Sequence, residues 1–267
     1  MRLIPRKRGA RLTLLGLAAG GVLLAGLGLL YLGVAPEDRT ADAVHLVEPS
    51  SRTVEERIAA VPEVAAVFDK LRALSASDYA SALAQAGRAR PGDPADSPDH
   101  WVSDAVRIAR QSHGALAAKA DAGPLSTLFD RQLAVVAALR EGDPRVCVEF
   151  LYGGASEGFF SFAEKRRGLV SALAAANLDA MADGRARKIE RGPVTDEDFD
   201  ALEAALRERG LDEAEIAALL DGKLPEPPPP DARLCQMGRL YLEAVASLPE
   251  PARLRIYALA AELMARS

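Results

Sequence analysis

Apolar residues recur every three or four positions over most of the chain beyond residue 52, and no convincing alternation of apolar and polar residues is present. The first pattern is typical of helices that bury one face, and the second would indicate strands. Prolines, glycines and capping residues divide the pattern into segments. The helices that this pattern predicts are 54–61, 62–74, 78–83, 98–109, 124–139, a short helix beginning at 144, 160–181, 196–210, 213–222, 231–248 and 250–264.

Residues 12–34 break this pattern, because they form one continuous apolar run without a charge. As a helix the run would measure roughly 34 Å, which is enough to cross a hydrocarbon core of about 30 Å. The preceding tail, residues 1–11, carries five bases and no acid, whereas acids follow the run at Glu37 and Asp38. By the positive-inside rule, the N-terminus lies in the cytoplasm and the rest of the chain lies across the inner membrane, in the periplasm or another extracytoplasmic space.

A cleaved signal peptide is the alternative interpretation of this N-terminus. Its apolar region is usually about 7–15 residues long and is followed promptly by a cleavage site with small residues. The run here is longer, and Pro36 directly follows the small residues that end at Ala35. We therefore favour a retained signal anchor.

Beyond the anchor, the sequence predicts a stalk over residues 35–52 and an extracytoplasmic helical domain over residues 53–267. Residues 224–230 read Leu-Pro-Glu-Pro-Pro-Pro-Pro, which excludes a helix and favours a stiff polyproline II spacer over a ligand for a proline-binding module. A helical pair follows over residues 231–264. The predicted fold class is therefore all-α, with a single N-terminal transmembrane helix followed by an irregular multi-helix bundle.

Charge narrows the range of partners. The chain carries a formal net charge of −5, and since five of its cations lie in the tail, the remainder carries −10. An acidic domain repels phosphate backbones, so we expect no nucleic-acid ligand. We also expect no cofactor and no metal site, because His100 and Asp104 can share a helix face but no third ligand is placed by the sequence.

Cys147 and Cys235 are the only cysteines, and both lie in the part of the chain that is predicted to be translocated. Each ends the pattern Asp-x-Arg-apolar-Cys, which indicates two helices that begin at capping aspartates, Asp143 and Asp231. In an oxidising compartment two such residues are expected to form one disulfide, which would bring the two helix starts together. A pair of buried thiols is the alternative.

An aromatic and glycine-rich segment, residues 150–162, follows the first cysteine. One interpretation is a groove lined by aromatics, with Glu157 as a weak candidate for a catalytic acid. The other is a tight corner between helices with its aromatics in the core. The candidate interaction residues in this segment are Phe150, Tyr152, Phe159 and Phe160.

Acids also gather at the start of the helix that Thr195 is expected to cap. Asp196, Asp198 and Asp200 have the spacing that opens a calcium loop, but the glycine and the final acid of such a loop are missing. These aspartates are either the solvated start of a helical hairpin or a docking surface for a basic partner.

Taken together, these features predict a non-enzymatic protein of the cell envelope, which presents a helical domain to an envelope protein partner. The alternative is a membrane-tethered hydrolase of cell-wall glycan or peptide with an acidic catalytic residue. A tethered folding helper for secreted proteins cannot be separated from the first hypothesis by sequence.

Overall fold

The computed structural model describes residues 50–90 and 92–266. All regular secondary structure in this part of the chain is helical, and it contains no strand. The predicted all-α class is therefore confirmed. The α-helices and one 3₁₀ helix (η3) are α1 (Ser50–Ala59), α2 (Pro62–Leu74), α3 (Ala76–Ala86), α4 (Pro98–His113), η3 (Gly114–Lys119), α5 (Ala122–Arg140), α6 (Pro144–Leu151), α7 (Glu157–Lys165), α8 (Arg167–Arg187), α9 (Asp196–Glu208), α10 (Glu213–Asp221), α11 (Asp231–Ala246) and α12 (Glu250–Arg266).

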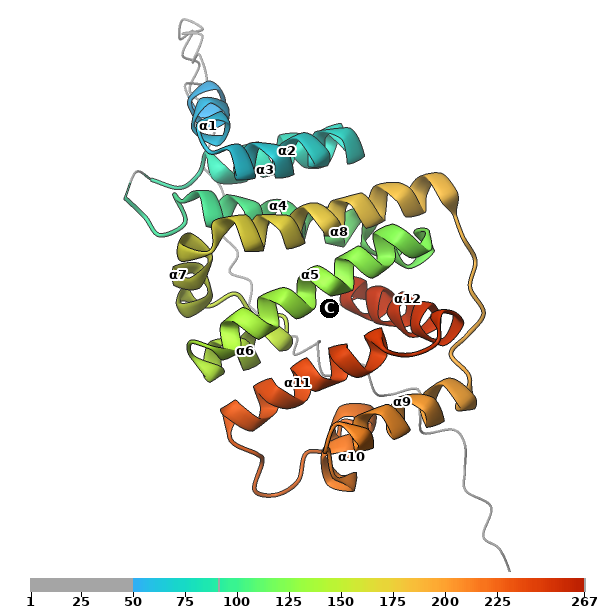
Figure 1. Ribbon diagram of the computed structural model, residues 1–267. Helices are drawn as coiled ribbons and strands as arrows, with labels where there is room; N and C mark the ends of the chain where they lie inside the picture. The colour runs from blue at the N-terminus through green and yellow to red at the C-terminus, as the bar shows by residue number, and fades with distance from the viewer. Residues whose placement is uncertain (1–49, 91, 267) are drawn as a thin grey trace, which may run out of the picture.

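The helices stack in successive levels (Figure 1). Helices α1 to α3 form one end, α4 and α8 lie beneath them, and α5 and α6 follow. Helices α11 and α12 pack against α5, and α9 and α10 close the other end. Helix α8 and the 3₁₀ helix η3 lie against each other, so the N-terminal and C-terminal halves share one continuous core.

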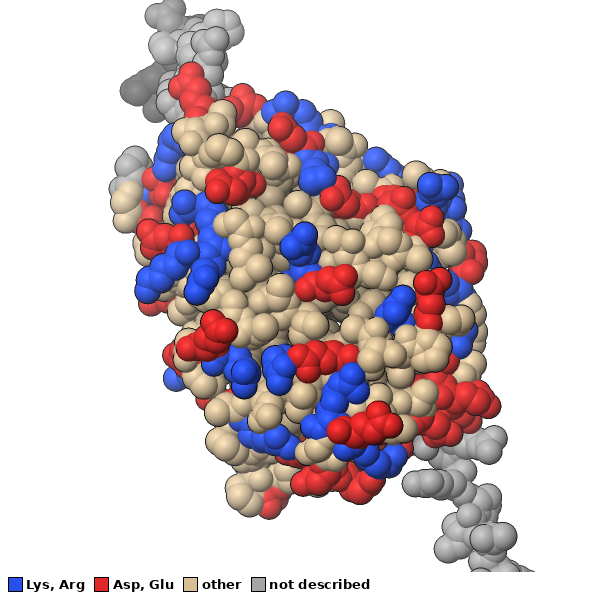
Figure 2. Space-filling view, viewed as in Figure 1, with Lys and Arg blue, Asp and Glu red and all other residues tan. Residues whose placement is uncertain are grey.

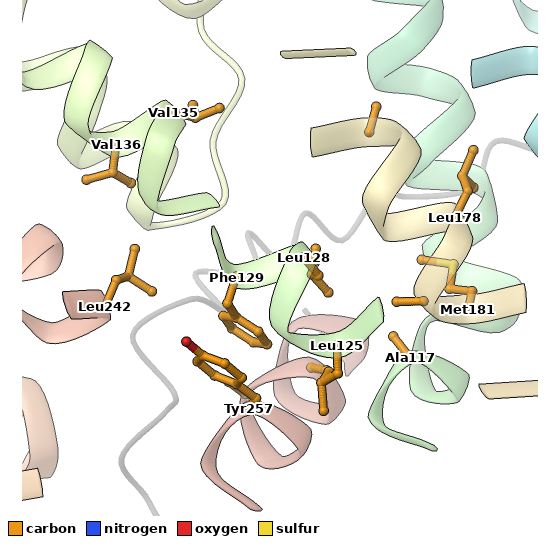
Figure 3. Close-up of a cluster of buried hydrophobic side chains, with 14 of the residues drawn as sticks. Ala117, Leu125, Leu128, Phe129, Val135, Val136, Leu178, Met181, Leu242 and Tyr257 are labelled. Atoms are coloured by element: carbon orange, nitrogen blue, oxygen red, sulfur yellow. The ribbon is translucent and has the colours of Figure 1, made fainter. Parts of the chain in front are cut away.

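The centre of this core is apolar and closely packed (Figure 3). The rings of Phe129 on α5 and Tyr257 on α12 stack at a centroid distance of 4.0 Å. Leu125 and Leu128 of α5 are almost completely buried, as is Met181 of α8. Burying each such side chain contributes about 1.5–3 kcal/mol to the stability of the fold, and the cluster joins α5 to α8 and α12.

Most of the predicted helix starts are confirmed by their caps. The side chains of Ser97, Asp143, Thr195 and Asp212 each accept a hydrogen bond from a backbone amide in the first turn of α4, α6, α9 and α10. Such caps satisfy amides that have no partner within the helix, and each is typically worth about 1 kcal/mol.

Two predicted helix starts and one predicted cap were wrong. Helix α1 begins at Ser50, earlier than the predicted start at residue 54. Helix α3 begins at Ala76 rather than at residue 78, and Ser75 caps it by accepting from the amide of Asp78. At α11 the N-cap is Pro230 and Asp231 is the first helical residue, where a carboxylate is favoured by the helix dipole without bonding an amide.

The single long helix predicted over residues 160–181 is wrong, because the chain forms two helices that meet at Arg166. The backbone of Arg166 leaves the helical region at φ −129° and ψ 33°. Directly after this break, the guanidinium of Arg167 makes two hydrogen bonds to the buried carboxylate of Asp99 on α4. This ion pair and the burial of Phe159 on α7 favour a change of direction over one continuous helix.

The η3 segment was not anticipated from the sequence, and its position depends on glycines. A Cβ atom at Gly184 of α8 would overlap the carbonyl oxygen of Leu116 in η3. A Cβ atom at Gly114 would lie 2.8 Å from the Cβ of Ala265 on α12. Only residues without a side chain allow α8 and α12 to approach η3 this closely.

The predicted transmembrane helix at 12–34, the tail at 1–11 and nearly all of the stalk at 35–52 lie outside the described residues. Within residues 50–90 and 92–266, no helix is both long enough and apolar enough to cross a membrane. Residues 222–230 connect α10 to α11 without helix, as their prolines predicted.

We expect Gly184→Ala to destabilise the protein by about 1–3 kcal/mol, because the new methyl group forces α8 away from the backbone of η3. Gly168→Ala is the matched control, since it lies on the same helix with no atom within 4 Å of its Cβ position. That variant should be neutral or gain up to about 1 kcal/mol from helix propensity. Urea unfolding followed by fluorescence of Trp101, the single and buried tryptophan, measures both. Equal stability of the two variants would contradict this packing.

Candidate functional site

Helices α6 and α11 are joined by a disulfide between Cys147 and Cys235, whose Cα atoms lie 5.7 Å apart. Both cysteines are completely buried. The structure thus confirms the predicted pairing of two cysteines that each lie about one turn inside a helix. The bond closes a loop over a sequence separation of 88 residues.

The same two helices touch directly beside the disulfide. A Cβ atom at Gly238 of α11 would overlap the side chain of Leu151 on α6. The glycine lets α6 and α11 approach, and the disulfide fixes the distance between them. Together, the glycine and the disulfide position the residues of α6 and α11 that line a cavity.

This apolar cavity has a volume of about 170 Å³ and lies among α5, α6, α10, α11 and α12. Its lining is mostly apolar and includes Phe129, Leu151, Leu219, Met237, Tyr241 and Leu263. Tyr152 and Leu224, which also line it, are 38% and 39% exposed. They are the exposed large hydrophobic residues of the described chain, so the cavity opens to the surface beside an apolar rim.

Of the four aromatic residues predicted as interaction candidates, only Tyr152 lines this cavity. Phe159 is buried and stacks on the ring of Phe150 at 5.4 Å between centroids. Phe160 stacks on the imidazole of His100 at 3.4 Å. The segment is therefore divided between a helix corner with packed aromatics and one exposed ring at the cavity rim.

Glu157, the candidate catalytic acid, is the exposed first residue of α7 and lines neither of the two cavities described here. The neighbouring Glu149 accepts a hydrogen bond from Ser156, and this bond together with Arg145 lowers the pKa of its carboxyl group. A lowered pKa keeps Glu149 ionised at neutral pH, which does not suit the proton donor that glycoside hydrolysis needs.

A second, charged cavity of about 320 Å³ lies among η3, residues 189–194 and helices α9, α10 and α12. Leu219, Tyr241 and Leu263 line both cavities and form a shared wall. Burial raises the pKa of Tyr241, and its hydroxyl makes no hydrogen bond within the described part of the chain. The phenol in this wall is therefore a neutral group with an unused donor.

The aspartates at the start of α9 occupy different environments. Asp198 is 4% exposed, accepts two hydrogen bonds from the guanidinium of Arg255 and completes a capping box with Thr195. Asp196 and Asp200 are exposed, and acidic side chains gather over this end of the molecule in Figure 2, whereas elsewhere on that face Lys and Arg are interspersed with Asp and Glu. Asp198 therefore joins α9 to α12, and only Asp196 and Asp200 present carboxylates at the surface.

Within residues 50–90 and 92–266 there is no group of three or more His, Cys, Asp or Glu side chains that could hold an ion. His100 instead shares a hydrogen bond of 2.7 Å with the hydroxyl of Ser97, and burial lowers the pKa of its imidazole.

The sequence did not single out Leu224, Arg191 or Tyr241, although all three line the cavities. Leu224 stands alone before a run of prolines, and Arg191 lies in a short segment between helices. No periodic pattern surrounds either residue, because their environment arises only when distant helices pack.

The chain matches no protein-family model, and no match is found among curated proteins or among solved structures.

The Asp198–Arg255 pair predicts acid-sensitive stability. The hydrogen bonds from Arg255 and Thr195 lower the pKa of Asp198, so the stabilisation is complete above the ordinary carboxyl pKa near 4 and is lost as pH falls through the lowered value. We expect Arg255→Gln to cost about 1–3 kcal/mol at pH 7, since it leaves a buried carboxylate short of a partner. The difference from the wild type should shrink at pH 3.

Urea unfolding of both proteins at pH 7, 5 and 3 measures this effect. Arg266→Gln is the matched control on the same helix, because its pairing with Glu262 at 3.7 Å is solvent-exposed and should contribute less than about 1 kcal/mol. A difference between Arg255→Gln and the wild type that is as large at pH 3 as at pH 7 would contradict the assignment.

Proposed function

We propose that this protein is a non-enzymatic interaction module of the cell envelope, which is anchored in the inner membrane by residues 12–34. Its periplasmic or extracytoplasmic helical domain binds an envelope protein partner at the rim of the apolar cavity. The observation that carries the proposal is the position of Tyr152 and Leu224, two exposed apolar side chains beside a cavity with a mostly apolar lining.

The dimensions of the apolar cavity suit one large apolar side chain from the partner. An engineered apolar cavity of about 150 Å³ in another protein admits benzene, which is the size of a phenylalanine ring. Binding sites between proteins commonly centre on such an anchor in a pocket, surrounded by a rim that excludes water. We infer a partner segment that inserts one leucine or aromatic side chain and covers Tyr152 and Leu224.

The cellular location rests on the sequence. The length of the apolar run and the five bases before it favour a single-pass anchor with a cytoplasmic N-terminus. The Cys147–Cys235 pairing fits the same topology, because disulfides persist in oxidising compartments outside the cytoplasm.

The cell-wall hydrolase hypothesis receives no support from a specific observation. Its candidate acid, Glu157, lies on the surface outside both cavities.

Site-specific photo-cross-linking in cells tests this function. With a photoreactive residue in place of Tyr152 or Leu224, we expect a cross-link to one envelope membrane protein, attached at an apolar segment. Tyr152→Asp should reduce recovery of that partner at least about tenfold, because a charge at the rim opposes burial of the partner's side chain. A cross-linker at Asp200 shows whether the acidic end of α9 makes the contact instead.

Gln111→Asp is the matched control, since Gln111 is exposed and outside both cavities and acquires the same charge. This variant should retain the partner. Loss of the partner in both variants, or cross-links from Asp200 but not from Tyr152 and Leu224, would overturn the proposed binding surface.

A further inference from the structure

The charged cavity contains an arginine in an unusual setting. Arg191 lies in the segment between α8 and α9, and its guanidinium donates to the carbonyl oxygens of Ala118 at 2.9 Å and Ala120 at 2.6 Å. These two bonds fix the cation across the end of η3. The side chain is partly buried and lines the charged cavity.

The other cations that line this cavity are neutralised by neighbouring acids. Lys119 pairs with Glu190 at 2.6 Å, and Arg255 makes its two bonds to Asp198. Arg191 has no carboxylate within ion-pair distance among the residues that the structure describes.

This environment is unfavourable for a cation. Burial lowers the pKa of Arg191, and the more distant charge of Asp121 offsets this effect only in part. A partly desolvated charge without a counterion costs free energy, which a bound anion would recover.

The unused N–H donors of Arg191, the lining of the cavity and its volume indicate the chemistry of that anion. A guanidinium has five N–H donors, and the two carbonyl bonds leave the others for a carboxylate. Much of the rest of the lining is apolar, with Ile189, Phe199, Leu220, Ile256 and Leu259, and the acids Asp196 and Glu262 also line the cavity. A volume of about 320 Å³ lies at the lower end of the range for small-molecule sites.

We propose that the charged cavity binds a small organic carboxylate with an apolar body, whose carboxylate pairs with Arg191 and whose hydrocarbon part contacts the isoleucine and leucine side chains. Tyr241 lies in the wall shared with the apolar cavity and offers a further donor. This site goes beyond the proposed protein partner, because Arg191 does not line the apolar cavity whose rim is Tyr152 and Leu224.

Octanoate is the probe for this site, and octanamide is its uncharged match. The isoleucines Ile189 and Ile256 line the charged cavity, whereas Met237 and Met264 line the apolar cavity. In methyl NMR spectra of the full chain, octanoate should shift the methyl resonances of Ile189 and Ile256 in a saturable manner. Octanamide should bind at least about tenfold more weakly, because it forms no ion pair.

Two variants test the roles of charge and space separately. Arg191→Met should weaken octanoate binding at least about tenfold, and Arg187→Met, which removes an arginine outside the cavity, should leave it unchanged. Ala258→Phe keeps Arg191 but fills the cavity that Ala258 lines, and it should also weaken binding. This second variant still tests the proposal if Arg191→Met, which removes the two hydrogen bonds to Ala118 and Ala120, prevents folding.

Three results would overturn the proposal. These are octanoate shifts confined to Met237 and Met264, equal affinity for octanoate and octanamide, and unchanged affinity in Ala258→Phe. Inorganic phosphate that binds as tightly as octanoate would show an adventitious ion only. None of these results bears on capture of a protein at Tyr152 and Leu224, so the two proposals fail separately.

Discussion

The arrangement of the apolar cavity depends on the contact between α6 and α11. The Cys147–Cys235 bond joins helices whose cysteines are 88 residues apart, and the absence of a side chain at Gly238 lets Leu151 pack against α11. In the chain-entropy model, closing a loop of this length stabilises the folded state by roughly 4–5 kcal/mol. The bond therefore contributes a large share of the 5–15 kcal/mol that a typical domain retains. It also fixes the distance between two walls of the apolar cavity.

A second set of constraints comes from buried acids near helix starts. Three carboxylates in the first turns of α9, α10 and α4 each bind the guanidinium of an arginine on another helix. The pairs are Asp198–Arg255, Glu215–Arg233 and Asp99–Arg167. Two of these carboxylates also complete capping boxes, so one group both stabilises the start of a helix and orients that helix against another. Each of these three carboxylates has an arginine partner. Arg191, by contrast, is the cation of the charged cavity that has no carboxylate partner among the described residues.

The sequence predicted local features well and tertiary features poorly. Helix starts at Ser97, Asp143 and Thr195 follow from capping chemistry, which needs only neighbouring residues. The cysteine pair was predictable because only one pairing exists. The break at Arg166 was missed, since the ion pair that favours it joins Arg167 to Asp99, 68 residues away. The cavities were missed for the same reason, because Leu224 and Arg191 acquire their surroundings only from distant helices.

We expect the α6–α11 disulfide to maintain the apolar cavity in a form that admits an apolar group. Benzene binding, followed by the methyl resonances of Met237 and Met264, measures this. In the oxidised full chain, benzene should shift both resonances in a saturable manner. Those shifts should diminish after reduction of Cys147 and Cys235. Saturable shifts of equal affinity in the reduced protein, or their absence in the oxidised protein, would contradict the account.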